Sequence, residues 1–386
     1  MPAFDLNEFF KLSSVLHYNL SAASLNRYTV MTYLLAGKRL DADERRDRDK
    51  KSLVMDALGY LFSAYSHKRR RLGPMAVLHP LRAAALLSRA GEVPDLEKLL
   101  TVLFHDILED VKPVDFDARE WKDMEGRLFD LLAHMSPEAE SRLMQRLKSL
   151  TRTKSETYYR YIGRMLESSA AFPDVVEVKL ADRLDNTLDM RIDLEDPLTG
   201  VDCFMSIFQL LFVPTYPGHA PPTDHQPATA MNGARRLHQL FKNSVLLSLI
   251  RQLAPAAETP VRKVLFEAVA HASLREAERT LMHLIGYHLK DRERQRQLLV
   301  DAMDYSHSGR SDLVTRPDGS RLLDGLFSTY FAPADGRVLK QQLDSLYQNK
   351  PLMLQACIAF IVIFLGFLNN PRYYVRGISA EGIEAS

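Results

Sequence analysis

The sequence of 386 residues is 46% hydrophobic and 26% charged, and its 50 lysines and arginines nearly balance its 49 aspartates and glutamates. The net charge of +1 excludes a chain-wide polycation that would coat nucleic acid, so no nucleic-acid partner is expected. Only two cysteines, Cys203 and Cys357, occur, which excludes a disulfide framework and a zinc–thiolate cluster. The length favours about two domains, each with its own core.

The N-terminal segment carries Asp5 and Glu8 and lacks the basic stretch that begins a secretory signal. Together with the scarcity of cysteine, this predicts a reducing, cytoplasmic location. Residues 352–368 are uncharged and strongly apolar, but a helix of that length spans roughly 25 Å, short of a ~30 Å hydrocarbon core. We therefore expect a buried core helix there, with membrane association of this C-terminal segment as the alternative.

Apolar residues recur at steps of three and four through most of the chain, as along one face of an amphipathic helix. No segment alternates convincingly between apolar and polar residues, so few strands are expected and the predicted fold class is all-α. Asp95 is a candidate N-cap, and an apolar helical pattern also follows His79. The expected helices cover residues 52–66, 95–109, 138–150, 155–168, 174–190, 203–212, 230–252, 257–304, 320–331 and 337–368.

Three segments interrupt this pattern and suggest how the chain is divided. Residues 38–51 are a mixed-charge run, typical of a solvated helix face or a surface linker. Residues 213–227 are rich in proline and cannot be helical throughout, which predicts a domain boundary or a surface lid. Residues 308–321 have the composition of a turn-rich loop. The expected parts are an N-terminal helical segment with a charged linker at 1–50, a central domain at 51–212, and a helical extension of open role at 228–386.

The strongest chemical signal lies at 103–111, where His105 and Asp106 adjoin and Glu109 and Asp110 each follow four residues later. Side chains at i and i+4 share one face of a helix, so a continuous helix pairs His105 with Glu109 and Asp106 with Asp110. Polar groups in a helix otherwise made of Leu, Phe, Ile and Val are costly to bury without a partner. Their presence therefore indicates a functional site.

Further candidates come from other segments. His79 precedes Pro80 and an apolar helical pattern, while Asp182 and Asn186 again stand at i and i+4 in an apolar helix. Two imidazoles and two carboxylates on rigid elements suit a cage for a divalent cation with a position open to water. This mix favours manganese, iron or zinc over calcium, and the missing thiolates argue against structural zinc. The candidate metal ligands are His79, His105, Asp106 and Asp182.

The order of these motifs resembles that of the HD-domain metal-dependent phosphohydrolases, most closely the hydrolase domain of Rel/Spo alarmone enzymes and their small stand-alone relatives. The family's HDxxED box is matched at 105–110, and its KLAD box, followed by an Asn, at 179–186. Residues 150–165 are similar to the LTR stretch of the stand-alone relatives. Arg70 and Arg71 stand where the family's R-x-S-G run leads into the first ligand. The resemblance covers roughly residues 50–195.

The resemblance implies an HD-domain helical bundle that binds one divalent metal ion, typically Mn²⁺, with Fe²⁺, Zn²⁺ or Co²⁺ as alternatives. It implies removal of the 3′ pyrophosphate from an alarmone nucleotide such as (p)ppGpp or an adenine counterpart. By the same resemblance the metal ligands are His79, His105, Asp106 and Asp182, and the catalytic acid/base pair is Glu109 and Asp110. The implied substrate-binding residues are Arg70, Arg71, Tyr161 and Asn186.

Three positions depart from the family's motifs, with Leu72 in place of Ser, Pro74 in place of Glu, and Asp185 in place of His. These changes spare the expected metal ligands and are expected to alter the substrate pocket. Two alternatives stay open at this point. One is an HD phosphohydrolase acting on a nucleotide monophosphate, triphosphate or cyclic nucleotide. The other is a non-catalytic nucleotide-binding scaffold whose C-terminus docks to a membrane or a partner.

Overall fold

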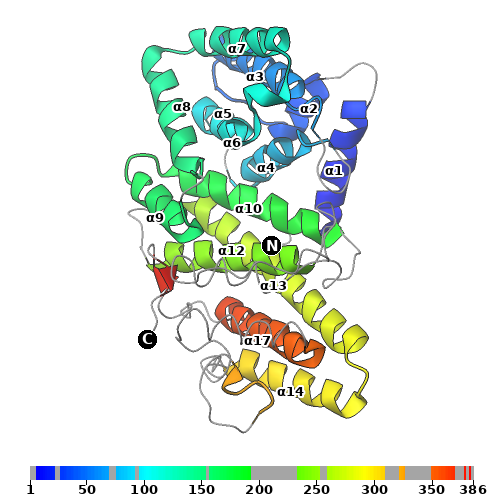
Figure 1. Ribbon diagram of the computed structural model, residues 1–386. Coiled ribbons are helices and arrows are strands. Elements are labelled where there is room, and N and C mark those ends of the chain that lie inside the picture. The colour runs from blue at the N-terminus through cyan, green and yellow to red at the C-terminus, as the bar shows by residue number, and fades with distance from the viewer. Residues whose placement is uncertain are drawn as a thin grey trace. The chain divides into compact units, whose positions relative to one another are not determined.

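The computed structural model describes residues 6–21, 27–68, 75–91, 95–153, 156–192, 233–252, 259–308, 321–326, 349–369, 378–379 and 382–383. Within these ranges the chain is helical apart from turns and one pair of two-residue strands, so the all-α prediction is confirmed (Figure 1). The chain forms two compact units. The first comprises Met1–Glu156, Arg164–Asp193 and Pro255–Val269, and the second comprises Thr157–Gly163, Leu194–Ala254 and Ala270–Ser386.

The first unit is a bundle of helices. Their bounds are α1 (Leu6–Ser21), α2 (Arg27–Leu34), α3 (Glu44–Ala64), α4 (Leu78–Arg89), α5 (Leu96–Phe104), α6 (Ile107–Asp110), the 3-10 turn η1 (Pro113–Asp115), α7 (Ala118–Ala133), α8 (Pro137–Leu150) and α10 (Asp174–Ile192). Two more helices lie partly in the first unit and partly in the second, namely α9 (Tyr158–Ser168) and α13 (Pro260–His283).

Helix α4 forms the centre of the first unit. Every residue from Leu78 to Ser88 is buried, and α10, α5, α2 and α1 all pack against this helix (Figure 1). Three successive alanines, Ala83 to Ala85, leave room for these neighbours to approach closely. The polar side chains of α4 consequently lie in the core and need partners there. Arg82 is the largest of them, with 2% of its surface exposed.

The charged run at 38–51 contains the start of α3. Asp43 caps this helix, because its side chain accepts a hydrogen bond from the Arg46 amide at 2.9 Å. Asp47 lies one turn further on, is buried, and accepts a hydrogen bond from the Leu40 amide at 2.6 Å. This bond ties the preceding loop to the helix. The helix-face interpretation of the run is therefore confirmed for its second half.

The single helix expected over 95–109 is wrong, because α5 and α6 are separate helices interrupted at His105 and Asp106. The predicted N-cap is confirmed, since the Asp95 side chain accepts a hydrogen bond from the Lys98 amide at 2.8 Å. The interruption has a backbone cause. Asp106 lies in the sparsely populated bridge region, at φ −100° and ψ 0°, which interrupts the helical backbone before α6 begins.

Helix α7 was not expected from the sequence, although a capping signal precedes it. The Asp117 side chain accepts hydrogen bonds from the Arg119 and Glu120 amides, and the Glu120 side chain accepts one from the Asp117 amide. This capping box fixes the start of the helix. The apolar signal is weak because the helix buries only Met124, Leu131 and Leu132.

The second unit holds the remainder of α13 and a further set of elements. These are α12 (Gly233–Gln252), the π-helical turn η3 (Leu284–His288), α14 (Arg292–Ser308), α17 (Lys350–Asn369) and the antiparallel pair β1 (Ile378–Ser379) and β2 (Gly382–Ile383). The helix expected over 257–304 is interrupted before α14, where the Asp291 side chain accepts hydrogen bonds from the Glu293 and Arg294 amides. Residues 321–325 form bends and turns where a helix was expected.

The remaining helix predictions divide into two groups. Those confirmed to within a few residues at their ends are 138–150, 155–168, 174–190 and 230–252, whereas the helix expected at 52–66 is confirmed but begins earlier, because α3 spans Glu44–Ala64. Others lie outside the described residues, namely the helix at 203–212, the proline-rich segment at 213–227, most of the loop at 308–321, and residues 337–348. The domain boundary expected near 213–227 therefore stays a prediction.

The apolar segment 352–368 makes up most of α17. Its side chains at Ile358, Ile361 and Val362 are completely buried, and α14 and α12 pack against the helix. Phe360 of α17 stacks on Phe241 of α12. Among the helices of the described ranges, none is long and apolar enough to cross a membrane. These contacts support the interpretation of this segment as a core helix.

Candidate metal centre

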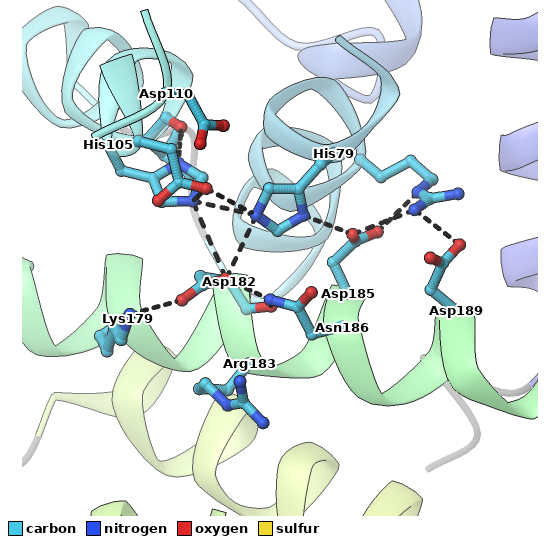
Figure 2. A network of polar contacts seen from close by, with 12 residues as sticks. His79, His105, Asp110, Lys179, Asp182, Arg183, Asp185, Asn186 and Asp189 are labelled. Carbon is cyan, nitrogen blue, oxygen red and sulfur yellow. Dashed lines mark hydrogen bonds and ion pairs between the residues drawn. The ribbon is translucent and has the colours of Figure 1, made fainter. Parts of the chain in front are cut away.

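Four predicted ligands meet in the first unit, although they come from three separate parts of its fold, and Figure 2 shows His79, His105 and Asp182 among them. His79 lies in the first turn of α4, His105 and Asp106 occupy the break between α5 and α6, and Asp182 lies in the middle of α10. The donor atoms converge. His79 Nε2 lies 3.1 Å from His105 Nε2 and 3.2 Å from both Asp106 Oδ2 and Asp182 Oδ1; His105 Nε2 lies 3.2 Å from Asp106 Oδ2 and 3.8 Å from Asp182 Oδ1.

These separations match the requirements of a metal ion. Donor atoms held about 2.1 Å from a cation lie roughly 3.0 Å apart at right angles and roughly 3.4 Å apart at the tetrahedral angle. His79, His105 and Asp182 thus form a buried group that could hold a metal ion. The Asp106 carboxylate adds a fourth donor atom, and 27% of its side-chain surface is exposed. All four donors are nitrogen or oxygen atoms.

The break between α5 and α6 allows two sequence neighbours to serve one site. In a continuous helix, consecutive side chains point about 100° apart around the axis, which separates their ends. Here the imidazole of His105 and the carboxylate of Asp106 both reach His79. His105 Nδ1 lies 2.8 Å from the Val102 carbonyl oxygen. Because that carbonyl can only accept, Nδ1 carries a proton and Nε2 is the nitrogen that faces the cluster, where its lone pair is available to a cation when the imidazole is neutral.

Two residues of α10 orient Asp182. The Lys179 ammonium lies 2.7 Å from Asp182 Oδ2, and the Asn186 amide donates to Asp182 Oδ1 at 2.5 Å and to the Asp182 carbonyl at 3.1 Å. The sequence also predicts that Asn186 binds substrate. Its amide holds the Asp182 carboxylate in place and its residue surface is partly exposed, while the substrate contact stays a prediction. Arg183 points away from the cluster (Figure 2).

A buried ion-pair network lies on the other side of His79. His79 Nδ1 is 2.6 Å from Asp185 Oδ2, and Arg82 Nε is 2.6 Å from Asp185 Oδ1. Arg82 Nη2 also lies 2.9 Å from Asp189 Oδ1. The Asp185 side chain has no exposed surface and contacts the ring nitrogen of His79 that faces away from the cluster, and its expected effect on the substrate pocket stays a prediction. The spacing of Asp185 and Asp189 in the sequence, one helical turn apart, indicates that the two carboxylates lie on the same face of a helix.

The cluster changes the pKa values of its own members. Burial by itself raises the pKa of Asp182, but the Lys179 ammonium and the two imidazoles outweigh it and hold that pKa well below its usual range. Burial has the same effect on Asp106, where His105 and His79 also prevail and lower the pKa. For His105, burial opposes protonation, yet the carboxylates of Asp106 and Asp182 raise its pKa to about 9. This concentration of negative charge favours a cation.

The two predicted catalytic carboxylates have different surroundings. Glu109 Oε1 accepts a hydrogen bond from the Arg152 backbone amide at 2.5 Å, so it is directed to the 151–153 segment and not to His105. Asp110 is exposed, and its Oδ2 accepts a hydrogen bond from the Tyr65 hydroxyl at 3.3 Å. Desolvation and the Asp106 carboxylate raise the pKa of Asp110. Desolvation likewise raises the pKa of Glu109.

Tyr65 and Lys68 follow the end of α3, and neither is among the site residues predicted from the sequence. The Tyr65 hydroxyl bonds the Asp110 side chain, and the Lys68 ammonium bonds the Asp110 carbonyl. Lys68 also pairs with Asp115 at 2.9 Å. Their distance from Asp110 in the sequence hides this relationship, because only the packing of α3 beside α5 and α7 brings them together.

Other predicted substrate residues are not brought to the cluster by the described structure. Arg70 and Arg71 lie outside the described residues, as do the departures Leu72 and Pro74. Tyr161 is 2% exposed, and its ring centroid lies 5.9 Å from that of Tyr158 within the second unit. Such burial is typical of a packing aromatic, and its predicted contact with a nucleoside stays a prediction.

A separate cavity of about 730 Å³ lies between α3 and α7. Its walls include Tyr60, Phe116, Met124 and Arg127, together with several acidic side chains, and no member of the metal-ligand cluster lines it. The cavity and the cluster are therefore different features of the first unit.

No protein-family model matches this chain, and no curated protein matches its sequence. The chemical interpretation therefore depends on the geometry of the chain's own residues.

Proposed function

We propose that the chain is a metal-dependent phosphohydrolase that removes pyrophosphate from the 3′ position of an alarmone-type nucleotide, such as (p)ppGpp or an adenine counterpart. The observation that carries the proposal is the convergence of two imidazoles and two carboxylates from α4, the α5–α6 break and α10, at separations suited to one cation. The motif resemblance in residues 50–195 supports the choice of substrate.

The proposed ligands are His79, His105, Asp106 and Asp182, and the proposed cation is Mn²⁺, with Fe²⁺, Zn²⁺ and Co²⁺ as the other candidates. Nitrogen and oxygen donors without a thiolate suit this group of ions. A bound divalent cation would lower the pKa of a water molecule and offset charge on the phosphate oxygens. The chain's own task is to hold these donors in place and keep one side accessible, and Asp106 is the most exposed of the four.

Asp110 is the proposed general base and acid. Its exposed carboxylate lies one turn after Asp106, the most exposed ligand, and Tyr65 holds one of its oxygens by hydrogen bonding. It accepts a proton from the attacking water and returns one to the leaving group. Glu109 assists by holding the Arg152 amide, which keeps the 151–153 segment beside α6.

Basic residues around the cluster support a phosphorylated substrate. Lys68 bonds the Asp110 carbonyl, Lys179 pairs with Asp182, and Arg152 is the residue whose backbone amide donates to Glu109. Ammonium and guanidinium groups at such positions attract polyanionic phosphates. Arg70 and Arg71 are proposed to contribute further phosphate contacts, as the resemblance implies.

A nucleotide panel tests the proposal. Full-length protein loaded with Mn²⁺ is incubated with (p)ppGpp, its adenine counterpart, nucleoside mono- and triphosphates, and cyclic nucleotides. Release of pyrophosphate from the 3′-pyrophosphorylated nucleotides, abolished by Asp106→Ala and retained by the surface control Asp49→Ala, supports it. Turnover of another nucleotide alone indicates a different phosphohydrolase. Metal binding without any turnover indicates a nucleotide-binding scaffold and contradicts the catalytic proposal.

A further inference from the structure

Of the two histidines in the ligand cluster, His79 is the one whose second ring nitrogen, Nδ1, faces a carboxylate. Asp185 Oδ2 lies 2.6 Å from His79 Nδ1, whereas His105 uses the backbone carbonyl of Val102 for the same purpose. A carboxylate at this position accepts a hydrogen bond from Nδ1–H, leaves the Nε2 lone pair directed at the cluster, and strengthens that nitrogen as a metal ligand.

Asp185 is buried without exposed surface, so its charge needs compensation inside the protein. Arg82 supplies it through two contacts, Nε to Oδ1 at 2.6 Å and Nη2 to Oδ2 at 3.1 Å. This bidentate pairing fixes the plane of the carboxylate as well as its position. Arg82 and His79 lie three residues apart on α4, so one helix presents both partners of Asp185 on the same face.

The remaining sides of the Arg82 guanidinium are also occupied. Asp189 of α10 lies 2.9 Å from Nη2. On α1, the Phe9 ring centroid lies 4.9 Å from Arg82 Cζ, and the Ser13 hydroxyl lies 3.4 Å from Nη1. Phe9 is 1% exposed, so this face of the guanidinium is covered. A continuous set of contacts thus runs from α1 through Arg82 and Asp185 to His79.

We propose that Asp185 and Arg82 are positioning residues for the metal centre, and that α1 completes this support by holding Arg82 through Phe9 and Ser13. Asp185 holds His79 in the tautomer and ring orientation that present Nε2 to the cation, and Arg82 holds Asp185. The inference rests on the proposed metal-binding function and adds an outer layer of residues to it. It also makes the N-terminal helix a determinant of metal affinity, although that helix supplies no ligand.

The test measures Mn²⁺ binding by calorimetry at one fixed pH, with full-length variants shown to be folded in EDTA. Removing an outer-layer partner of a metal ligand weakens affinity about 10- to 100-fold, and this is expected for Asp185→Ala and Arg82→Met. Asp185→Asn retains an oxygen that can accept a hydrogen bond from Nδ1–H, so this variant should bind Mn²⁺ more tightly than Asp185→Ala. Phe9→Leu keeps the apolar bulk and loses the ring, and is expected to weaken binding about two- to fivefold.

Arg89→Met is the matched control. Arg89 lies on the same helix and bonds the carbonyl oxygens of Tyr33 and Ala85, away from the cluster. The Arg89→Met substitution should lower the melting temperature in EDTA and leave the Mn²⁺ affinity unchanged. The absorption spectrum of the Co²⁺-loaded protein supplies a second measurement. If His79 is misplaced in Asp185→Ala, the Co²⁺ spectrum of that variant changes, whether or not the variant is also less stable.

The outcomes separate this inference from the function on which it rests. Wild-type protein that binds no divalent cation overturns both. Wild-type protein that binds Mn²⁺, while folded Asp185→Ala binds equally tightly with an unchanged Co²⁺ spectrum, overturns the positioning role and leaves the metal centre intact. An effect of Arg82→Met no larger than that of Arg89→Met overturns the role of Arg82 and α1.

Discussion

His105 and Asp106 are adjacent in the chain, and their ligand atoms, Nε2 and Oδ2, lie 3.2 Å apart. The two atoms lie close together because the helical backbone is interrupted between the end of α5 and the start of α6. The two neighbouring side chains can therefore both face His79. One short interruption thus supplies two of the four proposed ligands. The other two come from helices that pack against each other, α4 and α10.

Asp106→Asn should weaken Mn²⁺ binding by at least about tenfold, because the amide keeps the shape of the side chain but loses the charge. The same change lowers the electrostatic support for a protonated His105. Calorimetric titration with Mn²⁺ measures the loss. The control is Asp49→Asn on the exposed surface of α3. Equal affinities of the two variants would show that Asp106 is not a ligand.

The metal-free protein should become less stable between pH 6.5 and about 9. The folded state raises the pKa of His105 from 6.5 to about 9, so in this interval it binds more protons than the unfolded chain. The stabilisation is complete below pH 6.5 and is lost as the pH rises through 9. A shift of this size corresponds to roughly 3 kcal/mol.

Melting temperatures measured in EDTA across this pH interval test the prediction. His105→Gln should flatten the dependence, whereas His134→Gln, at an exposed position, should leave it intact. A wild-type melting temperature that rises between pH 6.5 and 9 contradicts it.

Substitutions of Glu109 and Asp110 should affect kcat to different extents. Asp110→Asn is expected to lower kcat about 100- to 10,000-fold with little change in Mn²⁺ affinity, because a general base is lost and the ligands stay in place. Glu109→Gln keeps a carbonyl oxygen that can accept the Arg152 amide, so its effect should be smaller than that of Glu109→Ala. Steady-state kinetics on the substrate found by the nucleotide panel measure both. Equal losses in Glu109→Gln and Asp110→Asn would argue against different roles.

Tyr65→Phe should shift the pH profile of kcat. The Tyr65 hydroxyl donates a hydrogen bond to Asp110 and so lowers the pKa of that carboxyl, against the larger upward effect of desolvation. Without the hydroxyl the pKa of Asp110 rises further, and the acidic limb of the profile moves to higher pH. At a fixed pH on the acidic limb, the loss of this one hydrogen bond corresponds to a fall in kcat of about 2- to 12-fold. An unchanged acidic limb would show that the titration of Asp110 is not the cause of that limb.

Ile361→Ala should destabilise the second unit by about 2–5 kcal/mol, because the side chain is completely buried in α17 and its loss leaves a cavity. The melting temperature in detergent-free buffer measures this. Val300→Ala in α14, where 54% of the residue surface is exposed, is the control and should have little effect. Near-equal melting temperatures would contradict the interpretation of residues 352–368 as a core helix.

Local chemistry made several features predictable from the sequence. Asp95 caps α5 because a short carboxylate next to free amides needs no tertiary partner. Asp182 and Asn186 share a face because α10 is continuous, as their i and i+4 spacing predicts, and the structure adds the hydrogen bond between them. The ligand set His79, His105, Asp106 and Asp182 could likewise be assembled from motif order, and the structure brings these residues together.

The tertiary structure decided the rest, because those features depend on which helices pack together. The break at Asp106 follows from a backbone conformation that the apolar periodicity of 95–109 does not reveal. Helical spacing places Asp185 three residues after Asp182, but only the packing of α10 on α4 puts it beneath His79 and against Arg82. Composition and spacing thus determined an all-α chain with a candidate metal cage, whereas long-range packing determined which side chains support that cage.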